Sequence, residues 1–486
     1  MFKNQLYSAE QSRELDQVAI HEFKIAGALL MQRAGYSIFE NIPKTSKNIV
    51  VFIGAGNNGG DGSVAAFFAK QAGLNVTVVY LGELSDIKND AKIMLSHAIN
   101  LGVEYQKYDQ NYAIPPTTDI IVDALLGTGL NKPVSGEYLS AINMINSAKK
   151  YVISADIPSG ICANAGLVLG CAIKANTTCT FIGYKKGLFT SDATDHVGEL
   201  ILNNLLVPEG VYEKVYSNVE KLDMTILESN MLSREQNTSK GVYGNLVVIA
   251  GDKGMPGAAL MNCMAALKIG AGKVNLITHP EHSNIICANA PEIMSHGLVD
   301  ENEILRYCQS ATAILIGSGT SLGCEWSEKV FEIIKKINKP IIADAGILDF
   351  LKTNKLDSNH LVITPHPGEA GRMLNLSPNE INQDRFLHVS QLAEKYNCIA
   401  VLKGKGTLIK SKDEAKIYLC PYGNPLMASA GMGDVLAGMI AGLSVQGYSL
   451  LDAAQIGVAK HSYIADQLVY AKGKKYLIAS DIYHNL

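Results

Sequence analysis

No stretch of this sequence approaches the ~20 consecutive apolar residues that are needed to span a bilayer. The N-terminus also lacks a basic segment followed by an apolar one, so we expect no secretion signal and no membrane insertion. The sequence also has no large excess of positive or negative charge. Its 42 Lys and Arg residues nearly balance its 46 Asp and Glu residues, which leaves a formal net charge of −4. We therefore expect neither a nucleic acid nor a membrane surface as a partner.

Cysteine is scarce and shows no metal-binding or disulfide pattern. The chain has nine cysteines, an odd number, and no two are closer than eight positions, so no C-x-x-C motif occurs. This spacing argues against a disulfide framework and against a zinc cluster. Most of the cysteines have apolar neighbours, which is typical of buried and reduced thiols. We expect a cytoplasmic protein.

Glycine, in contrast, is abundant, with 44 of 486 residues, or about 9% against the roughly 7% that is usual. The length corresponds to about three average domains or to two large ones. The positions of the glycines therefore bear on both the fold and the function.

Short β-branched runs alternate with amphipathic segments from residue 47 onward. Apolar strands separated by helical segments predict a parallel sheet with helices on both faces, a doubly wound α/β domain. One helix is expected from Ser8 to about Asn41, because Ser8 and Gln11 form a capping-box pattern. The predicted strands are residues 48–53, 75–81, 119–123, 151–155 and 178–182.

The predicted strands stop between about residues 208 and 243, where the chain becomes polar. We place the domain boundary there, with one domain at 1–220 and the other at 221–486. The second domain again alternates strands with helices and is predicted to be α/β. Its predicted strands are residues 245–250, 273–277, 313–316, 340–344, 360–364, 398–402 and 406–409.

A glycine-rich string, Gly54-Ala-Gly-Asn-Asn-Gly-Gly-Asp-Gly62, follows the first predicted strand and precedes a helix predicted at 63–70. Glycines at such a place let backbone N–H groups approach a phosphate. Its Gly-x-Gly-x-x-Gly pattern alone is a weak dinucleotide fingerprint, whose ribose-binding acid would be Glu83. A plain dinucleotide loop does not explain the amides and the carboxylate within the string.

Two further polar loops leave predicted strands, at residues 123–130 and 154–160. Ligands bind at the carboxyl ends of parallel strands, so the three loops are expected to converge on one crevice. Asn58, Asp123 and Ser159 supply oxygen ligands suited to a hard cation, and Asp156 is a candidate acid–base group. The alternative is that Asp123 and Asp156 only cap helices.

The three strings together resemble the signature of the YjeF-type N-terminal domain, the NAD(P)H-hydrate epimerase, over roughly residues 8–215. The resemblance implies a Rossmann-like fold, a potassium ion held by Asn58, Asp123 and Ser159, and action of Asp156 at the hydrated nicotinamide ring. It also implies two segments that contact the hydrated cofactor, NAD(P)HX: Asn57, Asn58, Gly59, Gly60 and Asp61, and Gly127, Thr128, Gly129, Leu130, Asn131, Lys132 and Pro133.

In the second domain, Gly431-Met-Gly433-Asp434 precedes a helix predicted at 435–445. A glycine turn into a helix gathers N–H donors and the helix dipole beside a carboxylate. That arrangement suits phosphoryl transfer, with Asp434 deprotonating the attacking hydroxyl. Gly438 and Gly442 lie one helical turn apart and are interpreted as packing positions.

This string resembles the anion hole and base of the ribokinase-like superfamily. Its companions at residues 254–259, 317–319, 344–345, 364–369 and 402–407 narrow the resemblance to the ADP- or ATP-dependent NAD(P)HX dehydratase, over about residues 240–480. Relatives usually have Thr at the position of Met432. The resemblance implies nucleotide contacts at Lys403, Gly404, Lys405, Gly406, Thr407 and Gly433, and contacts with the hydrate at Ala258, Gly319, His366 and Asp434.

A chain with both modules is expected to be an isomerase and a lyase that repairs hydrated nicotinamide cofactors. The first module would interconvert the R and S epimers at C6 through Asp156. The second would phosphorylate the C6 hydroxyl of the S epimer with ADP or ATP and Mg²⁺, with Asp434 as base, and phosphate elimination would restore NAD(P)H. We also expect a homo-oligomer. The alternatives are a vitamin-precursor kinase, which would share only residues 431–434, and a binding scaffold, which would share only the first fold.

Overall fold

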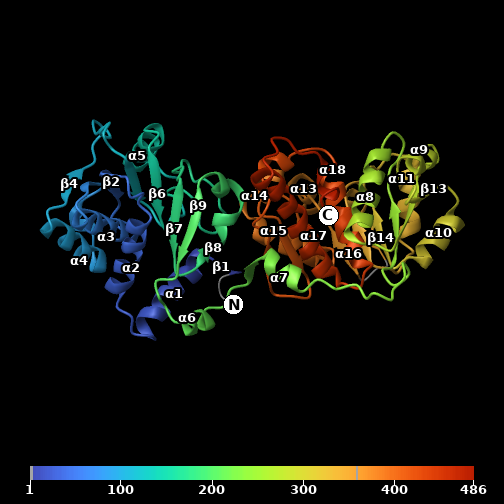
Figure 1. Cartoon of the computed structure of the whole chain (residues 1–486), viewed down its shortest axis with the longest axis horizontal. Coiled ribbons are helices and arrows are strands. Elements are labelled where there is room, and N and C mark those ends of the chain that lie inside the picture. Colours follow the sequence, from blue (N-terminus) through green and yellow to red (C-terminus); the bar gives the residue numbers. More distant parts are fainter. Residues whose placement is uncertain (1–3, 357–359) are drawn as a thin grey trace. The chain divides into compact units, whose positions relative to one another are not determined.

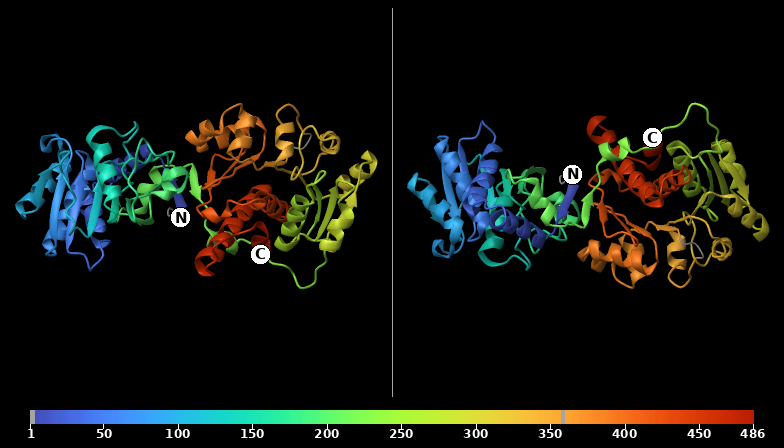
Figure 2. Two further views of the ribbon diagram at one scale, coloured as in Figure 1. Left: turned by 90° about the horizontal axis from the view of Figure 1, so that it is seen from above. Right: turned by 90° about the horizontal axis from the view of Figure 1, so that it is seen from below.

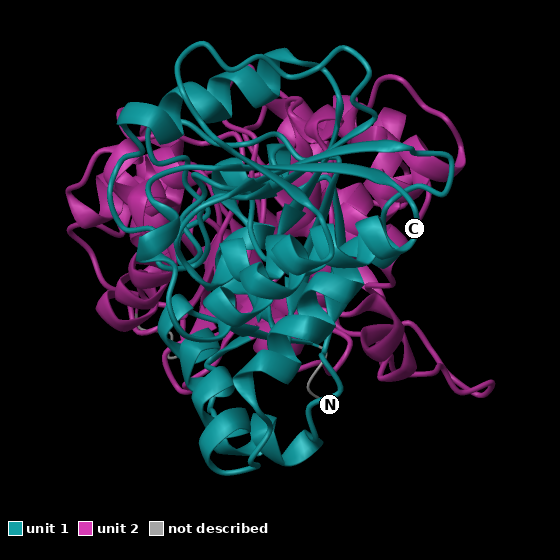
Figure 3. Cartoon of the chain, turned by 90° about the vertical axis from the view of Figure 1, so that its left-hand side faces the viewer, with its two compact units in different colours: residues 1–219 teal, residues 220–486 magenta. Residues whose placement is uncertain are grey.

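The computed structural model describes residues 4–356 and 360–486 (Figure 1). The chain divides into two compact units, Met1–Val219 and Glu220–Leu486 (Figure 3). This division falls one residue before the boundary expected from the sequence.

The N-terminal unit is built around a seven-stranded parallel sheet with the order β4-β3-β2-β5-β6-β7-β9. The strand order reverses between β2 and β5, and such a switch point opens a crevice at the carboxyl ends of the two strands. The strands are β2 (Asn48–Ile53), β3 (Asn75–Tyr80), β4 (Glu104–Lys107), β5 (Ile120–Ala124), β6 (Tyr151–Ala155), β7 (Thr177–Phe181) and β9 (Glu199–Asn203).

Helices cover both faces of this sheet (Figure 2). The central strand β2 shows the two cores directly, because Val51 packs into one hydrophobic cluster and Phe52 into another. The first cluster includes α2, α3 and α4, and the second includes α5. The helices are α1 (Ala9–His21), α2 (Gly27–Glu40), α3 (Asn57–Gln71), α4 (Asn89–Asn100), α5 (Gly136–Ser147) and α6 (Glu209–Lys214).

All five strands predicted for this unit are confirmed within two residues at each end. The strands β4 and β9 were not predicted, and β4 shows why, because its polar residues are mostly exposed at the sheet edge. The single helix expected from Ser8 to Asn41 is wrong. The capping box of Ser8 and Gln11 is present, but α1 ends at His21 and Lys24 takes a left-handed conformation (φ +57°) before α2 begins.

Helix α3 begins at Asn57, six residues earlier than predicted from the sequence. Its glycines are packing positions of a helix rather than part of a loop. A Cβ atom on Gly60 would lie 2.6 Å from Sδ of Met31 in α2, and one on Gly62 would lie 2.6 Å from Cβ of Ala124 in β5. Small residues therefore bring the first turns of α3 close to the sheet and to α2.

A short parallel pair, β1 (Gln5–Tyr7) and β8 (Tyr184–Lys185), also belongs to this unit. Leu6 pairs with Tyr184, and Tyr7 pairs with Lys185. The pairing fixes the backbone of Lys185 next to the start of α1.

The C-terminal unit has a sheet with the order β13-β12-β11-β14-β15-β16-β17-β18-β19. It is parallel from β13 to β17 and antiparallel from β17 to β19. All seven predicted strands are confirmed, and the switch point lies between β11 and β14. The strands are β11 (Asn245–Ile249), β12 (Lys273–Thr278), β13 (Met294–Gly297), β14 (Ala313–Ile316), β15 (Ile341–Ala343), β16 (Leu361–Ile363), β17 (Ile399–Leu402), β18 (Leu408–Ser411) and β19 (Ile417–Leu419).

The helices of this unit pack most closely where α8 meets α16. A Cβ atom on Gly438 would lie 2.3 Å from the carbonyl oxygen of Asn262, and one on Gly442 would lie 2.8 Å from Cα of Ala266. The interpretation of these glycines as packing positions is confirmed. The helices are α7 (Met224–Ser229), α8 (Pro256–Ile269), α9 (Ser283–Asn289), α10 (Glu301–Ser310), α11 (Glu325–Ile334), α12 (Gly346–Phe350), α13 (Pro367–Leu374), α14 (Pro378–Gln383), α15 (Arg385–Lys395), α16 (Met432–Ser444), α17 (Leu450–Asp466) and α18 (Ala479–Tyr483).

Among residues 4–356 and 360–486, no helix combines the length and the apolar character needed to cross a membrane. All nine cysteines are free thiols.

Replacing Gly442 by alanine tests the contact between α8 and α16. Because the added methyl group would meet the backbone of Ala266, we expect Gly442→Ala to lower the free energy of unfolding of the C-terminal unit by ~1–3 kcal/mol. Urea unfolding followed by circular dichroism measures the change. The matched control is Gly257→Ala on α8, where no atom lies within 4 Å of the added carbon and stability should be unchanged or slightly higher. Equal stability of the two variants would contradict the close-packing argument.

Candidate active sites

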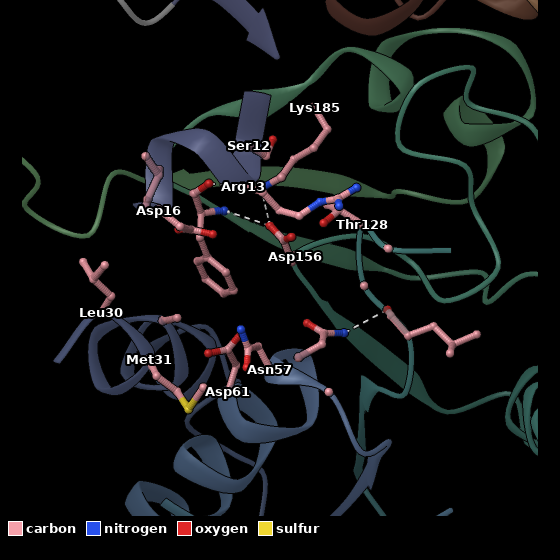
Figure 4. Close-up of a pocket in the computed structure, with 18 of the residues that line it drawn as sticks. Ser12, Arg13, Asp16, Leu30, Met31, Asn57, Asp61, Thr128, Asp156 and Lys185 are labelled. Carbon is pink, nitrogen blue, oxygen red and sulfur yellow. Dashed lines mark hydrogen bonds and ion pairs between the residues drawn. The ribbon is translucent and has the colours of Figure 1, made fainter. Parts of the chain in front are cut away.

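A cavity of about 840 Å³ opens at the switch point of the N-terminal sheet (Figure 4). Its walls come from α1, α2, the first turns of α3, the loop after β5, the end of β6, and β8. The predicted residues that line it are Asn57, Asn58, Asp61, Gly127, Thr128, Gly129, Leu130, Asn131, Lys132 and Asp156. Gly59 and Gly60 face Gly54 and Met31 instead, and neither they nor Pro133 line the cavity.

The three residues predicted to hold a cation lie in one hydrogen-bond network. Asp123 is fully buried, and its carboxylate accepts bonds from Oγ of Ser159 (2.6 Å) and Oγ of Ser154 (2.8 Å). The Asn58 amide donates to the carbonyl oxygen of Leu126 at 2.9 Å, and Oγ of Ser159 accepts from the backbone N–H of Leu126 at 2.8 Å. Burial raises the pKa of Asp123, and the hydrogen bonds from Ser159 and Ser154 oppose the rise. Oδ1 of Asn58 is buried and has no hydrogen-bond partner among the described residues.

Asp156 is held in an unusual backbone conformation at the end of β6. Its φ of +61° lies in the left-handed region, which non-glycine residues adopt mainly where the surrounding structure or a function requires it. Oδ1 accepts hydrogen bonds from Nζ of Lys185 and, both at 3.2 Å, from Oγ1 of Thr180 and the backbone N–H of Phe181. Asp156 therefore does not cap a helix, and the alternative interpretation of this residue as a helix cap is wrong.

Lys185 was not predicted from the sequence. Its side chain is 3% exposed, and Nζ also donates to Oγ1 of Thr180 and the carbonyl oxygen of Phe181. Nothing in the sequence marks this lysine, because the pairing of β1 with β8 is what brings it to Asp156.

Three more carboxylates line the same cavity, Asp90 from α4 and the pair of Asp16 from α1 and Asp61 from α3. By solvent accessibility Asp61 is half-buried and Asp16 is exposed. Burial raises the pKa of Asp16 to about 6, with Lys185 opposing and Asp156 adding to the rise. Burial, followed by the charges of Asp156 and Asp16, raises the pKa of Asp61 well above its usual range. Asp16 had not been singled out in the sequence, because it looks like any polar residue of an amphipathic helix.

In the C-terminal unit, Lys403 at the end of β17 is paired with two carboxylates. Its Nζ lies 2.9 Å from Oδ1 of Asp344 and 3.7 Å from Oε2 of Glu369. Burial lowers the pKa of Lys403, but the two carboxylates outweigh it and the pKa is raised. Thr364 donates to the same Oδ1 of Asp344 at 2.6 Å.

Asp434 lies beside this group in the first turn of α16. Gly431 caps the helix with φ +85°, and a Cβ atom on Gly433 would lie 3.4 Å from Nζ of Lys403. Burial, followed by the charge of Asp344, raises the pKa of Asp434 to about 6, while the Ser318 hydroxyl and Lys403 oppose the rise. The structure therefore brings the helix N-terminus, the lysine and the predicted base together. Met432 points away, into the hydrophobic core under α16.

The loops after β11 and β14 meet at the switch point. The backbone N–H of Gly251 donates to the carbonyl of Ser318 and that of Asp252 to the carbonyl of Gly319. A Cβ atom on Gly319 would lie 3.0 Å from Cβ of Ala258, so these two predicted residues are neighbours.

Both histidines near this site have a structural role. Nδ1 of His366 caps α13 by accepting from the backbone N–H groups of Gly368 (3.0 Å) and Glu369 (3.4 Å). His282 is 5% exposed, and its Nε2 accepts from the backbone N–H of Gly254.

Beneath the predicted nucleotide loop lies a buried arginine that the sequence did not reveal. Arg385 on α15 is 4% exposed and donates to the carbonyl oxygens of Leu402, Lys403 and Gly406, each about 3.2–3.3 Å away. It has no carboxylate partner among the described residues, and burial lowers its pKa to about 10. Arg385 therefore fixes the loop that carries Lys403 to Thr407 and leaves an unneutralised positive charge under it.

The fold and the two sites define a two-domain α/β enzyme, with a Rossmann-like domain and a ribokinase-like domain that each open a polar site at the carboxyl ends of parallel strands. Residues 27–187 match the model of the YjeF-related protein N-terminus, and residues 246–486 match the NAD(P)H-hydrate dehydratase model.

Relatives and solved structures agree with this class. The chain is 38% identical to a bifunctional NAD(P)H-hydrate repair enzyme of Coxiella burnetii (99% of this chain, 98% of the relative) and 35% identical to one of Escherichia coli (94% and 88%). The crystal structure of a ribokinase-like superfamily protein of Enterococcus faecalis aligns with 55% of this chain at 26% identity and a TM-score of 0.50. The alignment covers 94% of the Enterococcus faecalis chain. The chain belongs to the family of bifunctional NAD(P)H-hydrate repair enzymes, which confirms the resemblance found in its sequence.

The raised pKa of Asp434 predicts a cost in stability that depends on pH. Because the folded state holds this proton more tightly than the unfolded state, wild-type stability falls as the pH rises from about 4 through 6. We expect Asp434→Asn to be as stable as wild type at pH 4 and more stable at pH 7, by at most ~3 kcal/mol. Urea titrations at both pH values measure this, with the exposed Asp413→Asn as control. A difference that does not change with pH would contradict it.

Proposed function

We propose that this chain repairs hydrated NADH and NADPH through two activities. The N-terminal domain, residues 1–220, interconverts the R and S epimers of NAD(P)HX. The C-terminal domain, residues 221–486, uses ADP or ATP to dehydrate the S epimer to NAD(P)H, releasing AMP or ADP and phosphate. The observation that carries the proposal is the presence of two separate polar sites in a chain that matches the bifunctional family along almost its whole length.

In the N-terminal cavity, the hydrated nicotinamide lies against Asp156. All three described hydrogen bonds to this carboxylate go to Oδ1, which leaves Oδ2 for the C6 hydroxyl. Asn57, Asn58 and Asp61 contact the substrate from α3, and residues 127–133 contact it from the loop after β5. Gly59, Gly60 and Pro133 act by shaping the backbone of these two segments.

A potassium ion fits the network of Asn58, Asp123 and Ser159. The network offers only hard oxygen donors, including the Leu126 carbonyl, and such donors suit alkali and alkaline-earth cations. The buried Oδ1 of Asn58, which lacks a partner, is the atom that a cation would satisfy. When bound, the ion supplies a positive charge that orders the loops after β5 and β6.

In the C-terminal site, Asp434 accepts the proton of the C6 hydroxyl. The hydroxyl oxygen then attacks the terminal phosphorus of ADP or ATP, and AMP or ADP leaves. The N–H groups around Gly433 hold the transferring phosphoryl group. Phosphate is a far better leaving group than hydroxide, so loss of phosphate from C6 and of a proton from C5 restores NAD(P)H.

The loop of Lys403, Gly404, Lys405, Gly406 and Thr407 binds the adenine nucleotide. Arg385 supports this loop from below, and Lys405 braces it by donating to the carbonyl oxygen of Gly423 at 2.6 Å. Mg²⁺ accompanies the nucleotide phosphates, and Asp344 and Glu369 offer the carboxylate oxygens that this ion prefers.

The remaining contacts with the hydrate come from Ala258, Gly319 and His366. Ala258 and Gly319 form a small-residue surface between α8 and the loop after β14, which leaves room for a ring. Nδ1 of His366 accepts the bonds of the helix cap, so its Nε2 carries the hydrogen, and Nε2 lies 3.6 Å from Oε1 of Glu369.

We also infer a homo-oligomer in the cytoplasm. Closed symmetric assemblies are common among soluble enzymes. Nine unpaired cysteines suit a reducing compartment.

The dehydratase role of Asp434 is tested with S-NADPHX and either ADP or ATP, each run separately, while the return of NADPH absorbance is followed. Because the general base is lost, we expect Asp434→Asn to form NADPH at least ~100-fold more slowly than wild type. The exposed Asp413→Asn should keep the wild-type rate. NADPH formation by Asp434→Asn at the wild-type rate would contradict the assignment.

The epimerase role of Asp156 is tested with a mixture of both epimers and excess nucleotide. Wild type should consume the S epimer first and then the R epimer at a rate set by epimerisation. We expect Asp156→Ala to keep the first phase, because the C-terminal site is intact, and to slow the second phase to the spontaneous rate. Consumption of the R epimer as fast as in wild type would remove Asp156 from the mechanism.

A further inference from the structure

The N-terminal cavity holds more acidic groups than a single acid–base residue needs. Four carboxyl groups, those of Asp16, Asp61, Asp90 and Asp156, line it together with the buried ammonium group of Lys185. Among the residues that the structure describes, these carboxyls form no cluster that could hold a metal ion. Their presence therefore calls for a role in the reaction.

These groups come from different walls of the cavity. Asp156 and Lys185 lie on one side, and Asp61 lies on the other beside Asn57 (Figure 4). Lys185 makes an ion pair with Asp156 and with none of the other carboxyls that line the cavity. Asp61 is therefore an acid without a counter-ion on the far side of the cavity.

Two further features show that this cavity is a prepared ligand site. The buried Oδ1 of Asn58 lacks a partner and lines the same cavity as Asp61. Asp156 is held with φ +61°, a strained conformation that persists only where its surroundings enforce it.

The chemistry of epimerisation requires a group on each side of the ring. The C6 hydroxyl leaves from one face, and the epimer forms only when water adds to the opposite face. Hydroxide is a poor leaving group, so one face needs a proton donor while the other needs a proton acceptor.

We propose that Asp61 is the catalytic acid that protonates the departing C6 hydroxyl, that Asp156 takes the proton of the water adding to the opposite face, and that Asp16 is a positioning residue acting through Asp61. The inference rests on the epimerase activity proposed above and assigns its second catalytic group.

The step balances without any change of oxidation state. Asp61 gives its proton to the C6 oxygen, the C6–O bond breaks, water leaves, and the N1 lone pair forms an N1=C6 bond. A water molecule then adds to C6 from the other face, the N1=C6 pair returns to N1, and the second proton of that water passes to Asp156. The reverse epimerisation uses the same two residues in exchanged roles.

The electrostatics of the cavity keep Asp61 in the form that an acid needs. Burial and the charges of Asp156 and Asp16 raise the pKa of Asp61. The positive charge of Lys185 lowers it, but by less. The charged groups that face this space are Asp16 and Arg13 from α1, Asp90 from α4, Lys132 from the loop after β5, Asp156 and Lys185. Removing the charge of Asp16 therefore lowers the pKa of Asp61.

The first test measures epimerisation and oxygen exchange together. Full-length protein without nucleotide is incubated with R-NADPHX in H₂¹⁸O, and mass spectrometry follows both epimers and the incorporation of ¹⁸O at C6. Wild type should incorporate ¹⁸O as it epimerises, and Asp61→Asn should slow both processes by ~100-fold or more. Epimerisation without ¹⁸O incorporation, or wild-type rates in Asp61→Asn, would overturn the proposal.

The second test measures the pH profile of kcat/KM for epimerisation in Asp16→Asn. Because Asp61 must be protonated, activity falls as the pH rises past its pKa, and Asp16→Asn should move this alkaline limb to lower pH. The matched control, Glu14→Gln, removes an exposed acid of α1 outside the cavity and should leave the limb in place. An unmoved limb in Asp16→Asn would remove Asp16 from the mechanism even if the rate falls.

Folding and the proposed function are checked in the same samples. Each variant should keep the wild-type circular dichroism spectrum and thermal unfolding profile, which shows that both units are folded, because conversion of S-NADPHX with nucleotide reports only on the C-terminal unit. If wild type does not accelerate epimerisation at all, the proposed epimerase function fails. If wild type does so while Asp61→Asn and Asp16→Asn behave like wild type, only the present inference fails.

Discussion

In each unit, the site is organised by a lysine ammonium group, buried in one unit and half-buried in the other, that is paired with an aspartate at the end of a parallel strand. Lys185 pairs with Asp156 after β6, and Lys403 pairs with Asp344 after β15. Removing two charges from water is costly, and a buried charge that loses its partner is destabilising by several kcal/mol. Each pair therefore requires its surroundings to stay fixed: β8 must pair with β1 to hold Lys185, and the loop after β17 must stay closed over Arg385 to hold Lys403.

Glycine makes this arrangement possible in two different ways. On α3 and α16, Gly62 and Gly442 let a helix approach the neighbouring backbone or strand at distances that a side chain would prevent. At Gly431 the requirement is conformational, because the residue that caps α16 has φ +85°. The excess of glycine in the sequence thus marks helix packing as much as phosphate-binding loops. That is why the start of α3 looked like a loop in the sequence alone.

The sequence predicts the sheets and the strand-end residues well, because both depend on local pattern. Apolar runs predicted twelve strands, and Asn58, Asp123 and Ser159 lie together because the carboxyl ends of parallel strands share one edge of a sheet. The sequence could not predict Lys185, Asp16 or Arg385, whose roles depend on contacts between distant segments. Lys185 is an ordinary lysine until β1 pairs with β8, and Arg385 is an ordinary helix residue until α15 packs beneath residues 402–406.

The two sites share one charge pattern, although their folds differ. Each gathers three carboxyl groups around one lysine: Asp16, Asp61 and Asp156 around Lys185, and Asp344, Glu369 and Asp434 around Lys403. Each lysine contacts only some of these carboxyl groups. The groups without such a contact are Asp16 and Asp61 in one site and Asp434 in the other, and their pKa values are raised, first by burial and then by neighbouring negative charges. The burial of an incompletely neutralised carboxyl group lowers the stability of the fold, and raised pKa values of this kind are typical of functional sites.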